Sequence, residues 1–60
     1  MKAREIIKEL MNAGFVEVRQ KGSHRRFEDA YGHKATVPDH GGKDLKPGTV
    51  NSIRKQAGLK

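Results

Sequence analysis

The spacing of the apolar residues changes at Gly14, and this change predicts where the first elements of the chain lie. Before it, apolar residues recur at intervals of three and four, which places them on one face of a helix. That face contains Ala3, Ile6, Ile7, Leu10, Met11 and Ala13. Gly14 can adopt the left-handed backbone conformation that ends a helix. Residues 15–20 then change to a period of two and to β-branched types, which predicts a first strand.

Short turns predict two further strands and a second helix. Lys21-Gly22 supplies a tight turn, and residues 23–28 form a strand that pairs antiparallel with the first, because so short a link cannot contain a crossover. A second turn over residues 29–32 leads to a third short strand over residues 33–38. After a loop rich in glycine and charge, Pro47 favours the start of a helix. The predicted buried stripe of that helix is Val50, Ile53 and Ala57. Gly58 is expected to end the helix.

Both helical stripes need an apolar surface, and one face of a three-stranded sheet is the only surface large enough. We therefore expect an α+β fold, a two-layer sandwich of α-β-β-β-α order in which both helices cover one face of an antiparallel sheet. Residues 1–60 contain no repeat or linker, so they are expected to form one domain.

Alternation along the second strand predicts which side chains face the core. Phe27 is the one large apolar side chain there, so it should point inward with Arg25 on its side, while His24 and Arg26 point to the open face. The third strand should add two core residues, Ala35 and Val37.

The charge of the chain favours large anionic partners. The sequence has 13 Lys and Arg against 7 Asp and Glu, a net charge of +6, and its pI is about 10.1. A balance this basic is typical of nucleic-acid binding, although an acidic protein would fit it too. In a chain of 60 residues folding removes only about 60% of the surface from water, so a shallow site is expected rather than a deep cavity.

Cysteine content and hydropathy limit the remaining classes. The absence of cysteine excludes disulfides and thiolate zinc sites and is compatible with a reducing cytoplasm. No continuous apolar run is present, so neither a signal peptide nor a membrane-spanning helix is expected, and we predict a soluble protein.

The segment Lys21-Gly22-Ser23-His24-Arg25-Arg26-Phe27 places one histidine among three cations. Histidine has an ordinary pKa of about 6.5, so it can take up or release a proton near neutral pH. Positive charge close to such a group suits chemistry on a phosphodiester. The segment therefore indicates action on RNA.

The order and spacing of four segments resemble the HicA toxin family. These segments are Gly14-Phe15, Gln20-Lys21-Gly22-Ser23-His24, Thr36-Val37-Pro38-x-His40, and Lys46-Pro47-Gly48-Thr49 leading to Ile53-x-x-Gln56-Ala57-Gly58-Leu59. The resemblance implies a fold like a double-stranded-RNA-binding domain and a cytoplasmic toxin that cleaves mRNA and arrests translation. It also implies a HicB-like antitoxin that covers the site, so that the toxin is a monomer when free and part of a hetero-oligomer with its antitoxin. The essential histidine of the family falls on His24.

Cleavage of RNA without a metal requires a base for the 2′-hydroxyl, an acid for the departing 5′-oxygen and cations for the phosphate. His24 is the best candidate for the base, and proton transfer by a placed side chain is typically worth roughly 10²–10⁴ in rate. Lys21 and Arg26 are the expected phosphate contacts. His40 could supply the acid, orient the substrate, or only bond to the loop backbone.

Weaker candidates complete the predicted site. Ser23 could bind substrate, although turn chemistry is the favoured role for it. Lys43, after two glycines whose backbone could approach a phosphate, could add charge. His33 belongs to no motif and is expected to be exposed. No two histidines have a short ligand spacing, so we expect neither metal nor cofactor.

Two other classes fit the same composition. A non-catalytic RNA-binding module would recognise shape through phosphate and 2′-hydroxyl contacts, and a pure interaction protein would use its basic surface for an acidic partner. The first predicts RNA binding without cleavage, and the second predicts no RNA affinity at moderate salt.

Overall fold

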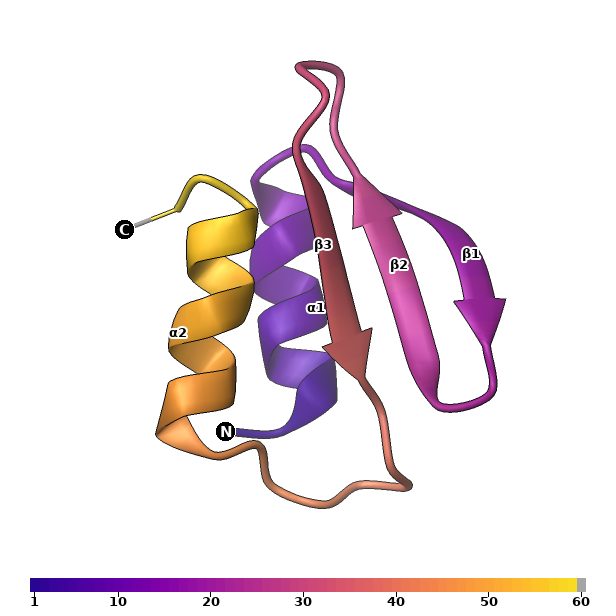
Figure 1. The fold of residues 1–60 in the computed structure, drawn as a ribbon, viewed down its shortest axis with the longest axis vertical. Helices are drawn as coiled ribbons and strands as arrows, with labels where there is room; N and C mark the ends of the chain where they lie inside the picture. The colour runs from indigo at the N-terminus through magenta and orange to yellow at the C-terminus, as the bar shows by residue number, and fades with distance from the viewer. Residues whose placement is uncertain (60) are drawn as a thin grey trace.

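The computed structural model describes residues 1–59, and its elements follow the predicted α-β-β-β-α order (Figure 1). They are helix α1 (Ala3–Asn12), strands β1 (Val16–Lys21), β2 (His24–Glu28) and β3 (Lys34–Pro38), and helix α2 (Pro47–Gln56). The strands form one antiparallel sheet in the order β1-β2-β3. The two helices lie side by side and cover the same face of this sheet (Figure 1). The expected α+β class is confirmed.

Helix α1 buries a narrower stripe than its sequence predicts. Its buried residues are Ala3, Ile6, Ile7 and Leu10. Met11 was expected in this stripe but is 55% exposed, because it lies about a quarter of a turn from the centre of the stripe. Ala13 is also exposed, since it caps the helix after its last residue. Gly14 has φ +96°, which confirms the left-handed helix ending.

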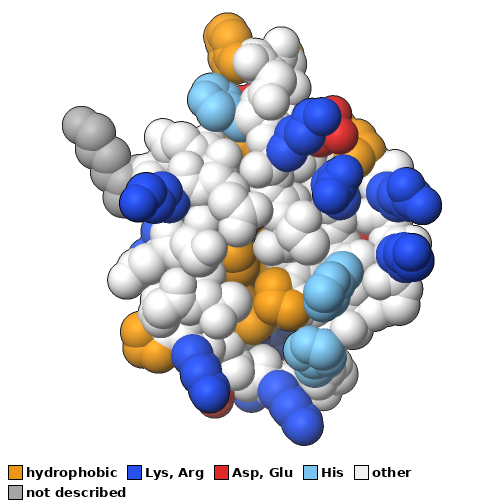
Figure 2. Space-filling view, in the orientation of Figure 1, with side chains coloured by type: hydrophobic (Ala, Val, Ile, Leu, Met, Phe, Trp, Pro, Cys, Tyr) orange, Lys and Arg blue, Asp and Glu red, His pale blue; other side chains and the backbone are white. Residues whose placement is uncertain are grey.

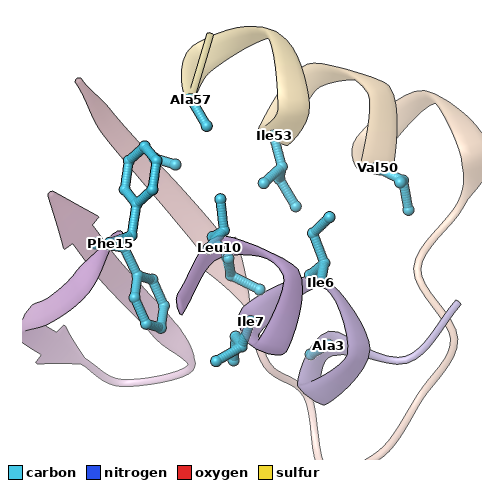
Figure 3. Packing of buried hydrophobic residues seen from close by; sticks show 11 residues of the cluster. Ala3, Ile6, Ile7, Leu10, Phe15, Val50, Ile53 and Ala57 are labelled. Carbon is cyan, nitrogen blue, oxygen red and sulfur yellow. The ribbon is translucent and has the colours of Figure 1, made fainter. Parts of the chain in front are cut away.

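Eleven buried apolar side chains form the core between the sheet and the helices (Figure 3). Phe27, Ala35 and Val37 face inward from the sheet, as alternation predicts, and each is at most 1% exposed. Helix α2 contributes Val50 and Ile53, and Ala57 follows directly after it, which confirms the predicted stripe. Phe15 joins the core before β1 begins and the remaining members come from α1.

An ion pair joins the two helices outside the apolar core. Arg54 of α2 donates hydrogen bonds to both carboxylate oxygens of Glu9 of α1, at 2.8 and 2.9 Å. These hydrogen bonds lower the pKa of Glu9 and raise the pKa of Arg54. Among residues 1–59, neither helix is long and apolar enough to cross a membrane.

The strand boundaries differ from prediction where turns take backbone hydrogen bonds. Lys21 pairs with His24 and so belongs to β1, which moves the turn to Gly22-Ser23. Strand β3 begins at Lys34 because His33 closes the preceding turn. The backbone N–H of Asp29 donates to the His33 carbonyl at 3.1 Å, and a carboxylate oxygen of Asp29 accepts the His33 N–H at 2.8 Å.

Strand β1 is an edge strand with a β-bulge. Its partners on β2 run from Glu17 opposite Phe27 directly to Arg19 opposite Arg26, so Val18 has no partner of its own. All six residues of β1 are exposed. The predicted period of two therefore does not appear as an alternation of buried and exposed residues.

Candidate functional site

The face of the sheet opposite the core, called the open face below, presents the residues singled out in the sequence. His24 and Arg26 point to it from β2, since Phe27 between Arg26 and Glu28 faces the core. Lys21 of β1 lies directly opposite His24. Figure 2 shows Lys and Arg side chains gathered over β1 and β2.

A shallow depression of about 290 Å³ lies on the open face. It is lined by Arg19, Lys21, His24, Arg26 and Thr36. The structure thus brings three of the predicted site residues together, and it adds Arg19 and Thr36, which the sequence did not indicate.

His40 lies beside His24, outside the residues that line this depression. Their ring centroids are 6.4 Å apart and the ring planes meet at 79°, an edge-to-face arrangement. Two histidine side chains lie side by side in Figure 2. Sixteen positions separate these residues in the sequence, so the loop after β3 must bring the second imidazole to the first.

A short backbone hydrogen bond holds that loop, residues 39–46, against the turn between β1 and β2. The N–H of Asp39 donates to the carbonyl of Ser23 at 2.6 Å. Ser23 therefore holds the loop through its backbone carbonyl, whereas a role of its hydroxyl, in capping the turn or in contacting substrate, stays a prediction. On the other side of the loop, Lys2 Nζ donates to the carbonyl of Gly42 at 2.6 Å.

Arg25 adds a second attachment for the same loop. Its Nη1 donates to Asp39 Oδ2 at 3.1 Å, and its Nε and Nη2 donate to the two carboxylate oxygens of Glu17, each at 2.8 Å. Its guanidinium also lies over Phe27, 5.9 Å from the ring centroid. The hydrogen bonds with Glu17 raise the pKa of Arg25, and they lower the pKa of Glu17. Alternation predicted the position of Arg25 on the core side, but not this role in holding the residue before His40.

Lys43 lies outside the depression. Gly41 and Gly42 have φ +65° and +87°, and the N–H of Lys43 bonds back to the His40 carbonyl at 3.5 Å. The two glycines thus form a turn, and the Lys43 side chain is exposed beside it. A substrate contact by Lys43 stays a prediction.

His33 is remote from this site. It is exposed, as predicted, and its Nδ1 lies 2.8 Å from Asp29 Oδ2 in the turn between β2 and β3. Among residues 1–59, no group of three or more histidine or carboxylate side chains is arranged to hold a metal ion.

The chemistry available on the open face is proton transfer next to positive charge. Two exposed imidazoles lie close together there, and imidazole is a common general acid and general base. The cations beside them can hold a phosphate, and a shallow exposed site admits a polymer.

A comparison with protein families supports this interpretation. A family model described as the HicA toxin of bacterial toxin-antitoxin systems matches residues 3–59, which include all five elements of the fold. A comparison with curated proteins found no match.

Proposed function

The chain belongs to the HicA toxin family and is the toxin of a toxin-antitoxin system, and from this premise we propose that it is an endoribonuclease that cleaves mRNA without a metal and so arrests translation. The observation that carries the proposal is the pair of exposed imidazoles of His24 and His40, whose ring centroids are 6.4 Å apart, with His24 lining the same depression as Lys21 and Arg26. This reaction takes place in the cytoplasm, where mRNA is translated.

His24 acts as the general base and His40 as the general acid. His24 takes the proton of a 2′-hydroxyl, and the 2′-oxygen attacks the adjacent phosphorus. The bond to the 5′-oxygen breaks, and that oxygen receives a proton from His40. The products are a 2′,3′-cyclic phosphate and a free 5′-hydroxyl, with His24 now protonated and His40 neutral. Lys21 and Arg26 contact the phosphates of the RNA, and Lys21, which lies directly opposite His24, stabilises the charge on the reacting phosphate.

The toxin pairs with an antitoxin, and a HicB-like protein is the partner we propose. Three cations of the depression line the open face, so an antitoxin that covers His24 with acidic residues would block substrate access and find complementary charge.

The test compares three histidine variants in buffer that contains a chelator. His24→Ala and His40→Ala should each lower the cleavage rate by roughly 10²–10⁴, and the wild-type pH profile should be bell-shaped. His33→Ala is the matched control, because it removes the remaining histidine at the other end of the sheet. It should cleave like the wild type.

Two results would contradict the proposal. Equal cleavage by His24→Ala would remove the base from the mechanism, and intact RNA with the wild-type protein over a pH series would leave an RNA-binding module. Induced expression gives a second measurement, since growth should stop with the wild-type chain and continue with His24→Ala.

A further inference from the structure

The bulge in β1 decides which cations reach the open face. In a regular ladder that starts from Glu17 opposite Phe27, Val18 would lie opposite Arg26 on the open face. The next residue, Arg19, would then point to the core side. Because the ladder skips Val18, Arg19 lies opposite Arg26 and lines the depression beside it.

This placement puts like charges directly across from each other. The Cα atoms of directly opposed residues on neighbouring antiparallel strands lie about 4.5–5.5 Å apart, and like charges in such pairs destabilise the sheet. Arg19 faces Arg26 in this way, and in the next row on the open face Lys21 lies opposite the imidazole of His24. Within residues 1–59 no ion pair involves Arg19, Lys21 or Arg26.

On the core-facing side of the same strands, the charge of Arg25 is neutralised by carboxylates. Arg25 is paired with two carboxylates, Glu17 and Asp39. The open-face cations, in contrast, have no carboxylate partner within residues 1–59 and are available to an external anion, and a bound phosphate would relieve the repulsion between them.

We propose that Arg19 and Arg26 form a second phosphate subsite, which holds the phosphodiester next to the one being cleaved. This proposal extends the proposed function and rests on it, because that function supplies RNA as the ligand. The row that contains His24 and the row that contains Arg26 are two residues apart along β2, a distance of about 7 Å. RNA would therefore run along the strands, with the reacting phosphate at His24 and its neighbour between the two guanidinium groups.

The test measures binding separately from cleavage. The ligand is a fluorescent single-stranded 2′-O-methyl RNA, which lacks the attacking hydroxyl, and its dissociation constant is measured by anisotropy over a series of salt concentrations. Loss of one phosphate contact should reduce the slope of log K against log salt by about 0.7, and should weaken binding roughly fivefold at about 0.1 M salt. Arg19→Gln should show this change.

Arg4→Gln is the matched control, because it removes the same charge from an exposed position on α1. It should leave the slope at the wild-type value, and equal slopes for the Arg4 and Arg19 variants would overturn the subsite. Since Arg19 and Arg26 hold the same phosphate, Arg19→Gln should cost less in an Arg26→Gln background than in the wild type. Fully additive losses would also overturn it.

The two proposals fail in distinguishable ways. If RNA stays uncleaved while binding depends on Arg19, the nuclease proposal falls and the phosphate subsite stands. If cleavage needs His24 while Arg19→Gln and Arg4→Gln bind RNA alike, the subsite falls and the nuclease stands.

Discussion

Replacing Phe27 by alanine should remove most of the stability of this domain. Phe27 is 0% exposed, and truncation of a buried phenylalanine typically costs about 3–5 kcal/mol. A domain of 60 residues has roughly 3–9 kcal/mol of total stability. With a shift of about 4–8 °C per kcal/mol, the melting temperature of Phe27→Ala should fall by at least about 12 °C. Phe27→Leu should lie between the two proteins, because leucine refills part of the cavity.

Thermal unfolding followed by circular dichroism measures this effect. The control is Tyr31→Ala, which removes an aromatic side chain that is 89% exposed and should change stability by less than about 0.5 kcal/mol. Similar melting temperatures for the two alanine variants would refute the assignment of Phe27 as the centre of the core. Loss of cleavage should then follow loss of folding, since Phe27 shares its strand with His24.

Three further predictions concern other contacts. Gly58→Ala should destabilise the protein by about 1–2 kcal/mol, because residue 58 has φ +72°. Gly48→Ala inside α2 should instead stabilise the protein by about 0.4–1 kcal/mol. Thermal melts in which both substitutions shift the melting temperature in the same direction would contradict this. The pKa of Glu9 lies below its ordinary 4.5, so the stabilising contribution of this group is present above pH 4.5 and is lost as the pH falls through the lowered pKa. The melting temperatures of wild type and Arg54→Gln should therefore converge in acid, and a constant gap would argue against the ion pair. Arg25→Gln should reduce kcat by about ten- to a hundredfold while RNA affinity changes little, because the loop that contains His40 loses its hydrogen bond from Arg25 to Asp39. An unchanged kcat in stopped-flow cleavage would contradict this role of Arg25.

The spacing of apolar residues predicted the fold well for those elements that bury one face. The spacing in α1, the inward position of Phe27 and the stripe of α2 each depend on one buried face, and each is present in the structure. Met11 shows the limit of this approach, because an apolar residue at the margin of a helical stripe is buried only if a neighbour extends that far.

The candidate site could be predicted only in part. Alternation placed His24 and Arg26 on the same face, since both belong to a strand with a buried anchor. Arg19 was missed because β1 has no buried side chain to fix its register, so nothing in the sequence indicates the bulge. The meeting of His24 with His40 depends on loop hydrogen bonds that join residues far apart in the chain.

The contribution of α2 to the core also determines when the protein can fold during its own synthesis. Val50, Ile53 and Ala57 close one side of the core, and they leave the ribosome after the whole sheet has emerged. Until they emerge, the apolar side chains of α1 and of the sheet lack the cover that α2 provides, and domains fold as units. A nascent chain that lacks these residues therefore has no rigid open face, and the protein acquires its site only once residue 57 has been released from the ribosome.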